Sequence, residues 1–203
     1  MEIGEPVSPP LPTPPAEKPE PCKRVYLHAF SGPRDKVFLI AFKLKLENSK
    51  EGGPEPTLDE VLIYTGHVGV SFEAQSPIYG FNPDSGSEPV HQVLDTLKGQ
   101  GSYPGHVTDD TSVFNKAKGM GLTVVVIEYV YPESDYNELK ARFDAEKAST
   151  NLRYGFPGGG DCNCATFPGR IGLPVPEGTG NMRLYMPAAA SALSPRRMGL
   201  CDG

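Results

Sequence analysis

One cysteine and one histidine of this sequence have the surroundings that nucleophilic catalysis needs. Cys164 closes the segment GGGDCNC, and an apolar stretch begins directly after it. Glycines before a cysteine let a substrate approach the backbone closely, and the N–H groups of a following helix stabilise a thiolate and an oxyanion. Cys164 is therefore the predicted nucleophile, and Cys162, two residues earlier, is the alternative.

The Cys-x-Cys pair has three other interpretations. Such a pair binds zinc when further ligands lie near it, but no nearby histidine or cysteine completes a tetrahedral site, so we predict no metal and no cofactor. If the protein is exported, the pair is expected to form disulfides with Cys22 and Cys201. Free cysteines are also among the most buried residues, so packing in the core is the third interpretation.

The predicted base is His67, in the segment GHVGVSFE of a β-rich run over residues 61–73. Alternation along this strand predicts a small, polar face, as expected where a groove stays open, formed by Thr65, His67, Gly69 and Ser71. The alternative is a structural histidine that is hydrogen-bonded within the fold. The remaining histidines lie in segments typical of loops or element edges, and we expect them at the surface: His28, His91 and His106.

A hairpin supplies the third group of the predicted site. Residues 77–83 are typical of a strand that pairs with the His67 run across a turn near Gln75, which places His67 opposite residues 82–84. A carboxamide or carboxylate there would fix the orientation of the imidazole. Asn82 is preferred and Asp84 is the alternative, although Asn-Pro-Asp is also ordinary turn chemistry.

The elements that must hold these residues follow from hydrophobic patterning. Residues 37–47 alternate and predict a strand, and the most apolar run, 122–131, predicts a central strand. Residues 134–149 predict a helix with a capping box of Asp135 and Glu138, and its apolar stripe comprises Tyr136, Leu139 and Phe143. Pro168 follows Cys164 by four residues, so the helix after the nucleophile must be short or irregular, and its field at the thiol weak.

Composition predicts one loop-rich domain after a proline-rich tail. The 203 residues include 23 glycines and 22 prolines, which exclude a helical bundle, while 38% hydrophobic residues suffice for one core. Eight of the prolines lie in residues 1–21, and we expect a spacer there, or a segment that tethers the chain to a carrier protein. Residues 22–203 form the predicted domain.

Charge and hydropathy limit the partners. A net charge of −6, without a run of Lys or Arg longer than a pair, argues against nucleic acid. We expect no transmembrane segment, because no stretch of 18 apolar residues occurs. The N-terminus lacks the basic start and apolar run of an ordinary signal peptide, which leaves a cytoplasmic location or export by a non-Sec route.

The order of these parts resembles the circularly permuted papain-like cysteine enzymes, in which the histidine precedes the cysteine. This superfamily includes permuted cell-wall amidase and endopeptidase families, the lecithin:retinol acyltransferase group and the PPPDE deubiquitinase-like group. The residues that carry the resemblance are His67 with Gly69 and Val70, the YGF of residues 79–81, and Asn163-Cys164 with Phe167. Two departures are the lack of a second histidine at 78–84 and the interruption at Pro168 and Gly169.

The resemblance implies an α+β fold with an antiparallel sheet and hydrolysis or transfer at an amide or ester through an acyl-enzyme. Cys164 would attack, His67 would act as base and then acid, and Asn82 would orient it. The expected substrate is a peptide, peptidoglycan or a protein, and an effector or toxin module would suit the tethered domain. The alternatives are an acyltransferase or thioesterase on lipid, for which the sequence shows no obvious membrane-docking element, and a non-catalytic interaction domain.

Overall fold

The computed structural model describes residues 21–33, 35–74, 77–84, 91–93, 95, 100–155 and 162–174. Of the expected features, all of the proline-rich tail but Pro21 lies outside the described residues, as do the three glycines at 158–160 and Cys201. Among the described residues no helix is long and apolar enough to cross a membrane.

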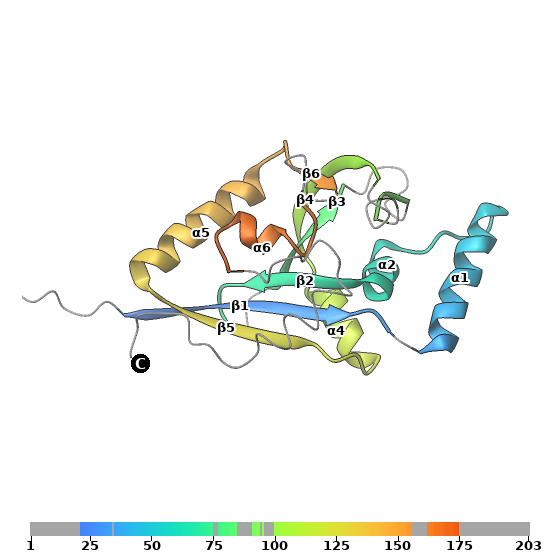
Figure 1. Cartoon of the computed structure of the whole chain (residues 1–203), viewed down its shortest axis with the longest axis horizontal. Helices are drawn as coiled ribbons and strands as arrows, with labels where there is room; N and C mark the ends of the chain where they lie inside the picture. Colours follow the sequence, from blue (N-terminus) through green and yellow to red (C-terminus); the bar gives the residue numbers. More distant parts are fainter. Residues whose placement is uncertain are drawn as a thin grey trace, which may run out of the picture.

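The described residues form a single antiparallel sheet in the order β5-β1-β2-β3-β4-β6 (Figure 1). Its strands are β1 (Cys22–Ser31), β2 (Gly66–Ser71), β3 (Tyr79–Pro83), β4 (Ser102–Asp109), β5 (Val125–Pro132) and β6 (Arg153–Gly155). The helices are α1 (Lys36–Lys50), α2 (Leu58–Thr65), α4 (Thr111–Gly119), α5 (Glu133–Ala148) and α6 (Phe167–Arg170). The α+β class with an antiparallel sheet is confirmed.

Each face of the sheet carries its own apolar cluster. The larger cluster joins alternate residues of the strands to α5 and α6, and it includes Leu27, Val68, Val70, Phe81, Leu139, Phe143 and Phe167. The smaller cluster lies under α4 and α2 and comprises Phe30, Leu62, Ile63, Ile78, Val113, Phe114 and Ala117. Alternate residues of a strand point to opposite faces of the sheet. The valines of β2 therefore belong to the larger cluster, whereas His67 points to the face that carries the smaller cluster.

The predicted strand over 37–47 is wrong, because these residues form helix α1. Asp35 caps the helix by accepting hydrogen bonds from the backbone N–H groups of Val37 (2.7 Å) and Phe38 (3.3 Å). Phe42 is buried and stacks on Tyr64 with ring centroids 4.1 Å apart. Residues four apart, such as Phe38, Phe42 and Leu46, lie on the same side of a strand and also on the same side of a helix. This apolar pattern is therefore compatible with both structures.

The β-rich run over 61–73 also divides differently from the prediction. Its first part continues α2, which begins at a capping box of Thr57 and Glu60. Gly66 ends the helix with a φ of 88°, a conformation that favours glycine, and strand β2 starts there. Thr65 is therefore the last helical residue and is not on the strand with His67.

Two further predictions are corrected and one helix is confirmed. The run over 122–131 does form strand β5, but it lies at the edge of the sheet and not at the centre. Helix α5 confirms the prediction for 134–149, with Leu139 and Phe143 buried. The expected capping box is wrong, because the helix begins after Pro132 without a side-chain cap, and Glu138 instead pairs with Arg142.

Candidate active site

The hairpin of β2 and β3 has the predicted register over a short stretch. Gly69 pairs with Gly80 and Val70 with Tyr79, and the ladder between these two strands stops there. Extended by two residues, the same register sets His67 against Asn82. Because β2 continues to pair with β1, and β3 with β4, the sheet is split between His67 and Asn82.

His67 is paired with a carboxylate that the sequence analysis missed. Its Nε2 lies 2.6 Å from Oδ2 of Asp110, and both side chains are buried. Asn82, the predicted orienting residue, instead donates from its Nδ2 to both Asp110 oxygens, at 3.0 and 2.8 Å. Thr108 donates to Oδ1 of Asp110 at 2.7 Å. Asn82 thus holds the group that holds His67, and the alternative Asp84 is exposed at the surface.

The place of Asp110 follows from the pairing of β3 with β4. Gly80 pairs with Thr108, and Asp110 is the residue that precedes α4. An aspartate there ordinarily caps its helix, but this carboxylate makes no capping bond and points to His67 instead. In the sequence, Asp110 stands out only as part of an Asp-Asp-Thr step between a β-rich run and a helical run. This step predicts the start of a helix but does not indicate that Asp110 pairs with His67.

Gly80 lies directly beneath the His67–Asp110 hydrogen bond. A Cβ atom built on Gly80 would come within 1.9 Å of Asp110 Oδ2 and 2.3 Å of His67 Nε2. Any side chain would therefore separate the pair, so the bare backbone is a requirement of the site.

Cys164 also interacts with His67. Asp110 contacts Nε2 of the imidazole, and Nδ1 is buried without a hydrogen-bond partner among the described residues. Burial lowers the pKa of His67, but the interactions with Cys164 and with Asp110 raise this pKa to about 10. The interactions with His67, Thr108 and Asn82 outweigh burial and lower the pKa of Asp110. The arrangement favours an imidazolium beside the Asp110 carboxylate.

A capped turn holds Cys164 in place. Asn163 Oδ1 accepts from the backbone N–H groups of Ala165 (3.0 Å) and Thr166 (3.2 Å), and Thr166 Oγ1 accepts from the Asn163 N–H at 3.0 Å. These reciprocal bonds cap the turn that contains Cys164. Helix α6 then spans only four residues around Pro168, which confirms the expected short helix.

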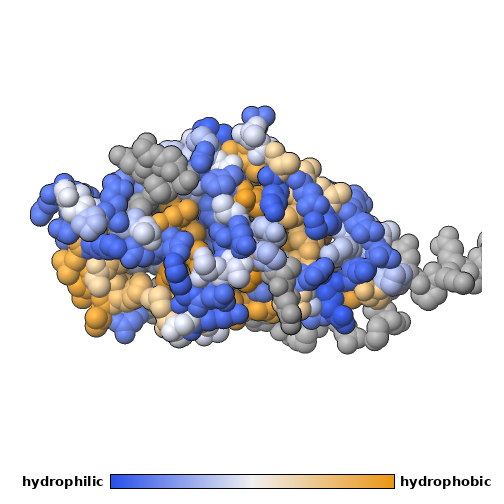
Figure 2. Space-filling view, turned by 180° about the vertical axis from the view of Figure 1, so that it is seen from behind, coloured by the Kyte–Doolittle hydropathy of each residue, from blue (hydrophilic) through white to orange (hydrophobic). Residues whose placement is uncertain are grey.

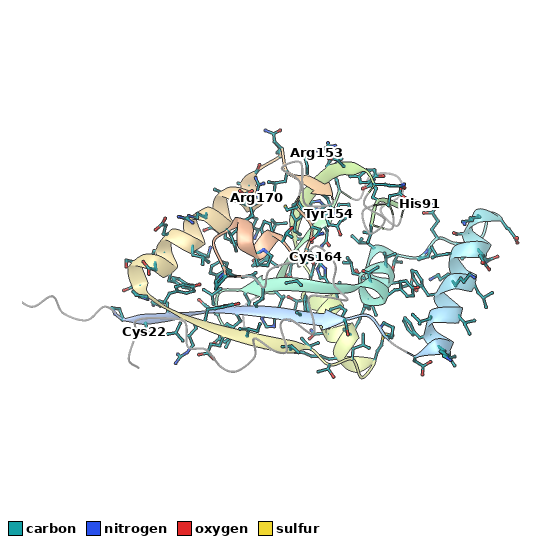
Figure 3. The ribbon with its side chains drawn as sticks, viewed as in Figure 1. Cys22, His91, Arg153, Tyr154, Cys164 and Arg170 are labelled. Carbon is teal, nitrogen blue, oxygen red and sulfur yellow. The ribbon has the colours of Figure 1, made fainter. Side chains whose placement is uncertain are left out.

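The structure separates Cys164 from the other described cysteines. Cys162 bridges to Tyr154 in the sheet, and its backbone N–H donates to Arg153 O at 3.1 Å. Cys22 lies at the far end of β1, well away from Cys164 (Figure 3). Of these three cysteines, Cys164 is the one that interacts with His67.

A buried tyrosine completes the surroundings of the sulfur. Tyr154 lies beside Cys164 in Figure 3 and packs against Phe81 with ring centroids 5.7 Å apart. Burial, and after it the charges of Cys164, Cys162 and Asp110, raise the pKa of Tyr154 well above its usual value. The hydroxyl therefore stays protonated and can donate a hydrogen bond within the site.

The small face of β2 is covered, contrary to the expected open groove. The ring of Phe114 lies 5.7 Å from that of His67 and 5.9 Å from that of His28, and a Cβ on Gly69 would come within 3.0 Å of it. His28 is therefore not at the surface as predicted; it is buried on β1 and its Nε2 lies 2.8 Å from Ser71 Oγ.

The remaining histidines lie outside this cluster. His91 is exposed, as predicted, and His106 is half-buried on strand β4. Within the described part of the chain, no group of three or more His, Cys, Asp or Glu side chains is arranged to hold a metal ion.

No family model matches this chain, and no curated protein or solved structure is significantly similar to it. The family resemblance and the function it implies therefore depend on the residues and the geometry of the site.

Proposed function

We propose that this protein is a cysteine hydrolase that cleaves an amide bond through an acyl-enzyme, as an amidase or peptidase. The observation that carries the proposal is the series Cys164–His67–Asp110, in which a thiol, a buried imidazole and a buried carboxylate interact in order. Nucleophile, base and orienting acid in this order are the parts of a papain-like mechanism.

Each residue has one role in the proposed reaction. The Cys164 thiolate attacks the carbonyl carbon of the substrate, and the Cys164 N–H helps to bind the oxyanion. His67 then gives its Nδ1 proton to the leaving amine, which breaks the C–N bond and leaves a thioester on Cys164. Water attacks the thioester, His67 takes up its proton, and the acid is released as the thiolate–imidazolium pair returns.

An acyltransferase or thioesterase on the same fold is the second candidate. One observation favours it: helix α1 exposes Val37, Ile40 and Leu44, an apolar stripe of the kind that docks an enzyme on lipid. Peptidoglycan fragments, ubiquitin-like conjugates and lipid esters assayed in parallel distinguish the two candidates. A non-catalytic interaction domain predicts no turnover of any of them.

Alkylation by iodoacetamide at pH 6, with the labelled peptides identified by mass spectrometry, tests the catalytic pair. We expect Cys164 to react fastest, because a protonated His67 beside the sulfur promotes its reaction as a nucleophile. His67→Ala should slow this labelling by at least about tenfold. Cys162→Ala is the matched control and should leave the rate unchanged.

Circular dichroism must show that each variant remains folded. Equal labelling rates of Cys164 in the wild type and in folded His67→Ala would show that the histidine does not activate the thiol, and the hydrolase proposal would fail. Faster labelling of Cys162 than of Cys164 would transfer the nucleophile to the alternative residue.

A further inference from the structure

Helix α1 has an apolar stripe that no other part of the described chain covers. Val37, Ile40 and Leu44 are 76%, 59% and 58% exposed, which makes them the most exposed large apolar side chains of the described residues. Their spacings of three and four residues place them on one face of the helix. Single exposed apolar residues are ordinary, but a row of three on one helix is not.

The stripe is not the face that attaches α1 to the domain. The opposite face does so, through the stack of Phe42 on Tyr64 and the ion pair of Lys45 with Glu60 at 2.6 Å. Helix α1 lies at one end of the molecule, beyond α2 (Figure 1). From behind, the same end shows a hydrophobic patch next to hydrophilic surface (Figure 2).

Basic side chains line one flank of the stripe. Lys36, Lys43 and Lys50 recur every seven residues, so they form a row along the helix. The middle lysine, Lys43, makes an exposed ion pair with Glu47 at 3.8 Å. Helix α1 has four lysines and one glutamate, in a chain whose net charge is −6. A helix with an apolar stripe and a lysine flank is the type that lies in a membrane interface and is attracted to anionic headgroups.

We propose that α1 docks the protein reversibly on a membrane surface that contains anionic lipid. Val37, Ile40 and Leu44 enter the boundary between headgroups and acyl chains, and the lysine row contacts lipid phosphates. The charges argue against a second copy as the occupant. If two copies of α1 paired antiparallel through their stripes, the lysine flank of one helix would lie against the lysine flank of the other. The like charges would repel each other.

The absence of tryptophan from the sequence allows a direct test. Ile40→Trp in the full chain introduces a single indole into the stripe, and Met120→Trp is the matched control, because Met120 is 46% exposed on another helix end. With phosphatidylcholine vesicles that contain phosphatidylserine, we expect a blue shift of the emission for Ile40→Trp and none for Met120→Trp. Vesicles of phosphatidylcholine alone should give a weaker response.

Vesicle flotation measures the same binding without an indole. The double variant Ile40→Glu with Leu44→Glu should bind anionic vesicles at least about tenfold less than the wild type, and Met120→Glu should bind equally. Cys164→Ala should also bind anionic vesicles as well as the wild type does. The docking proposal and the hydrolase proposal can therefore be refuted independently. The proposal is overturned by no flotation of the wild type, by equal binding to both vesicles, or by a concentration-dependent dimer that the double variant abolishes.

Discussion

At the scale of single residues, the site depends on a chain of buried polar contacts. Asn82 and Thr108 hold Asp110, Asp110 holds His67, and His67 interacts with Cys164. Buried polar groups are costly unless they are paired, so each member fixes the next. Asp110 is therefore the positioning residue of the imidazole, and Asn82 acts through it.

Replacing Asp110 by alanine should lower the pKa of His67. The carboxylate raises this pKa by its charge and its hydrogen bond, and a folded-state value near 10 means that His67 stays protonated until the pH rises through that value. NMR titration of the imidazole nitrogens measures the change. Asn82→Ala should give a smaller decrease. An unchanged His67 titration in Asp110→Ala would contradict the assigned role.

At the scale of elements, the turn before α6 compensates for a broken helix. Pro168 has no N–H, so the Cys164 carbonyl does not receive the regular helical bond from it. Helix α6 is too short to place a strong field at the thiol. The Asn163 cap fixes Cys164 locally, so in the proposed mechanism the activation of the thiol is left to His67.

Asn163→Ala should destabilise the protein and slow the alkylation of Cys164. The substitution removes the acceptor of two backbone hydrogen bonds, which costs about 1 kcal/mol of unfolding free energy. Urea unfolding measures this cost. Asn151→Ala, at an exposed position, is the control and should change the free energy by less than about 0.5 kcal/mol. Equal stability of both variants would show that the cap does not hold the turn.

At the scale of the whole molecule, two buried histidines on one side of the sheet have opposite charge preferences. Both lie against Phe114, but His67 pairs with the Asp110 carboxylate, whereas His28 is buried with Ser71 and repelled by Lys118. Burial and Lys118 lower the pKa of His28 to about 4, so folding keeps it neutral. The sheet thus carries one imidazole that favours the charged form and one that favours the neutral form.

The protein should therefore lose stability on acidification below neutral pH. The unfolded chain binds a proton at His28 below about pH 6.5, whereas the folded chain does so only near pH 4. Between pH 6.5 and 4.5 this difference costs about 2–3 kcal/mol. Two other groups contribute a constant amount to the folding stability in this window. The contribution of His67 is fully present below pH 6.5, and that of Asp110 is present above about pH 4. Urea unfolding at both pH values should give a smaller difference for His28→Gln. An equal loss in this variant would assign the effect to other groups.

The structural features that depend on near neighbours along the chain could be predicted from the sequence. Helix α5, the β2–β3 register and the short α6 all follow from local spacing. The choice of Cys164 and His67 as a pair comes instead from the order of parts in the family that the sequence resembles. The form of 37–47 could not be assigned from its apolar pattern, because a spacing of four suits a strand and a helix alike. The cap at Asp35 is a local signal for the helix, whereas the stack of Phe42 on Tyr64 is a long-range contact that the tertiary structure alone shows. Likewise, Asp110 reaches His67 through β3–β4 pairing, a long-range contact that local periodicity does not encode.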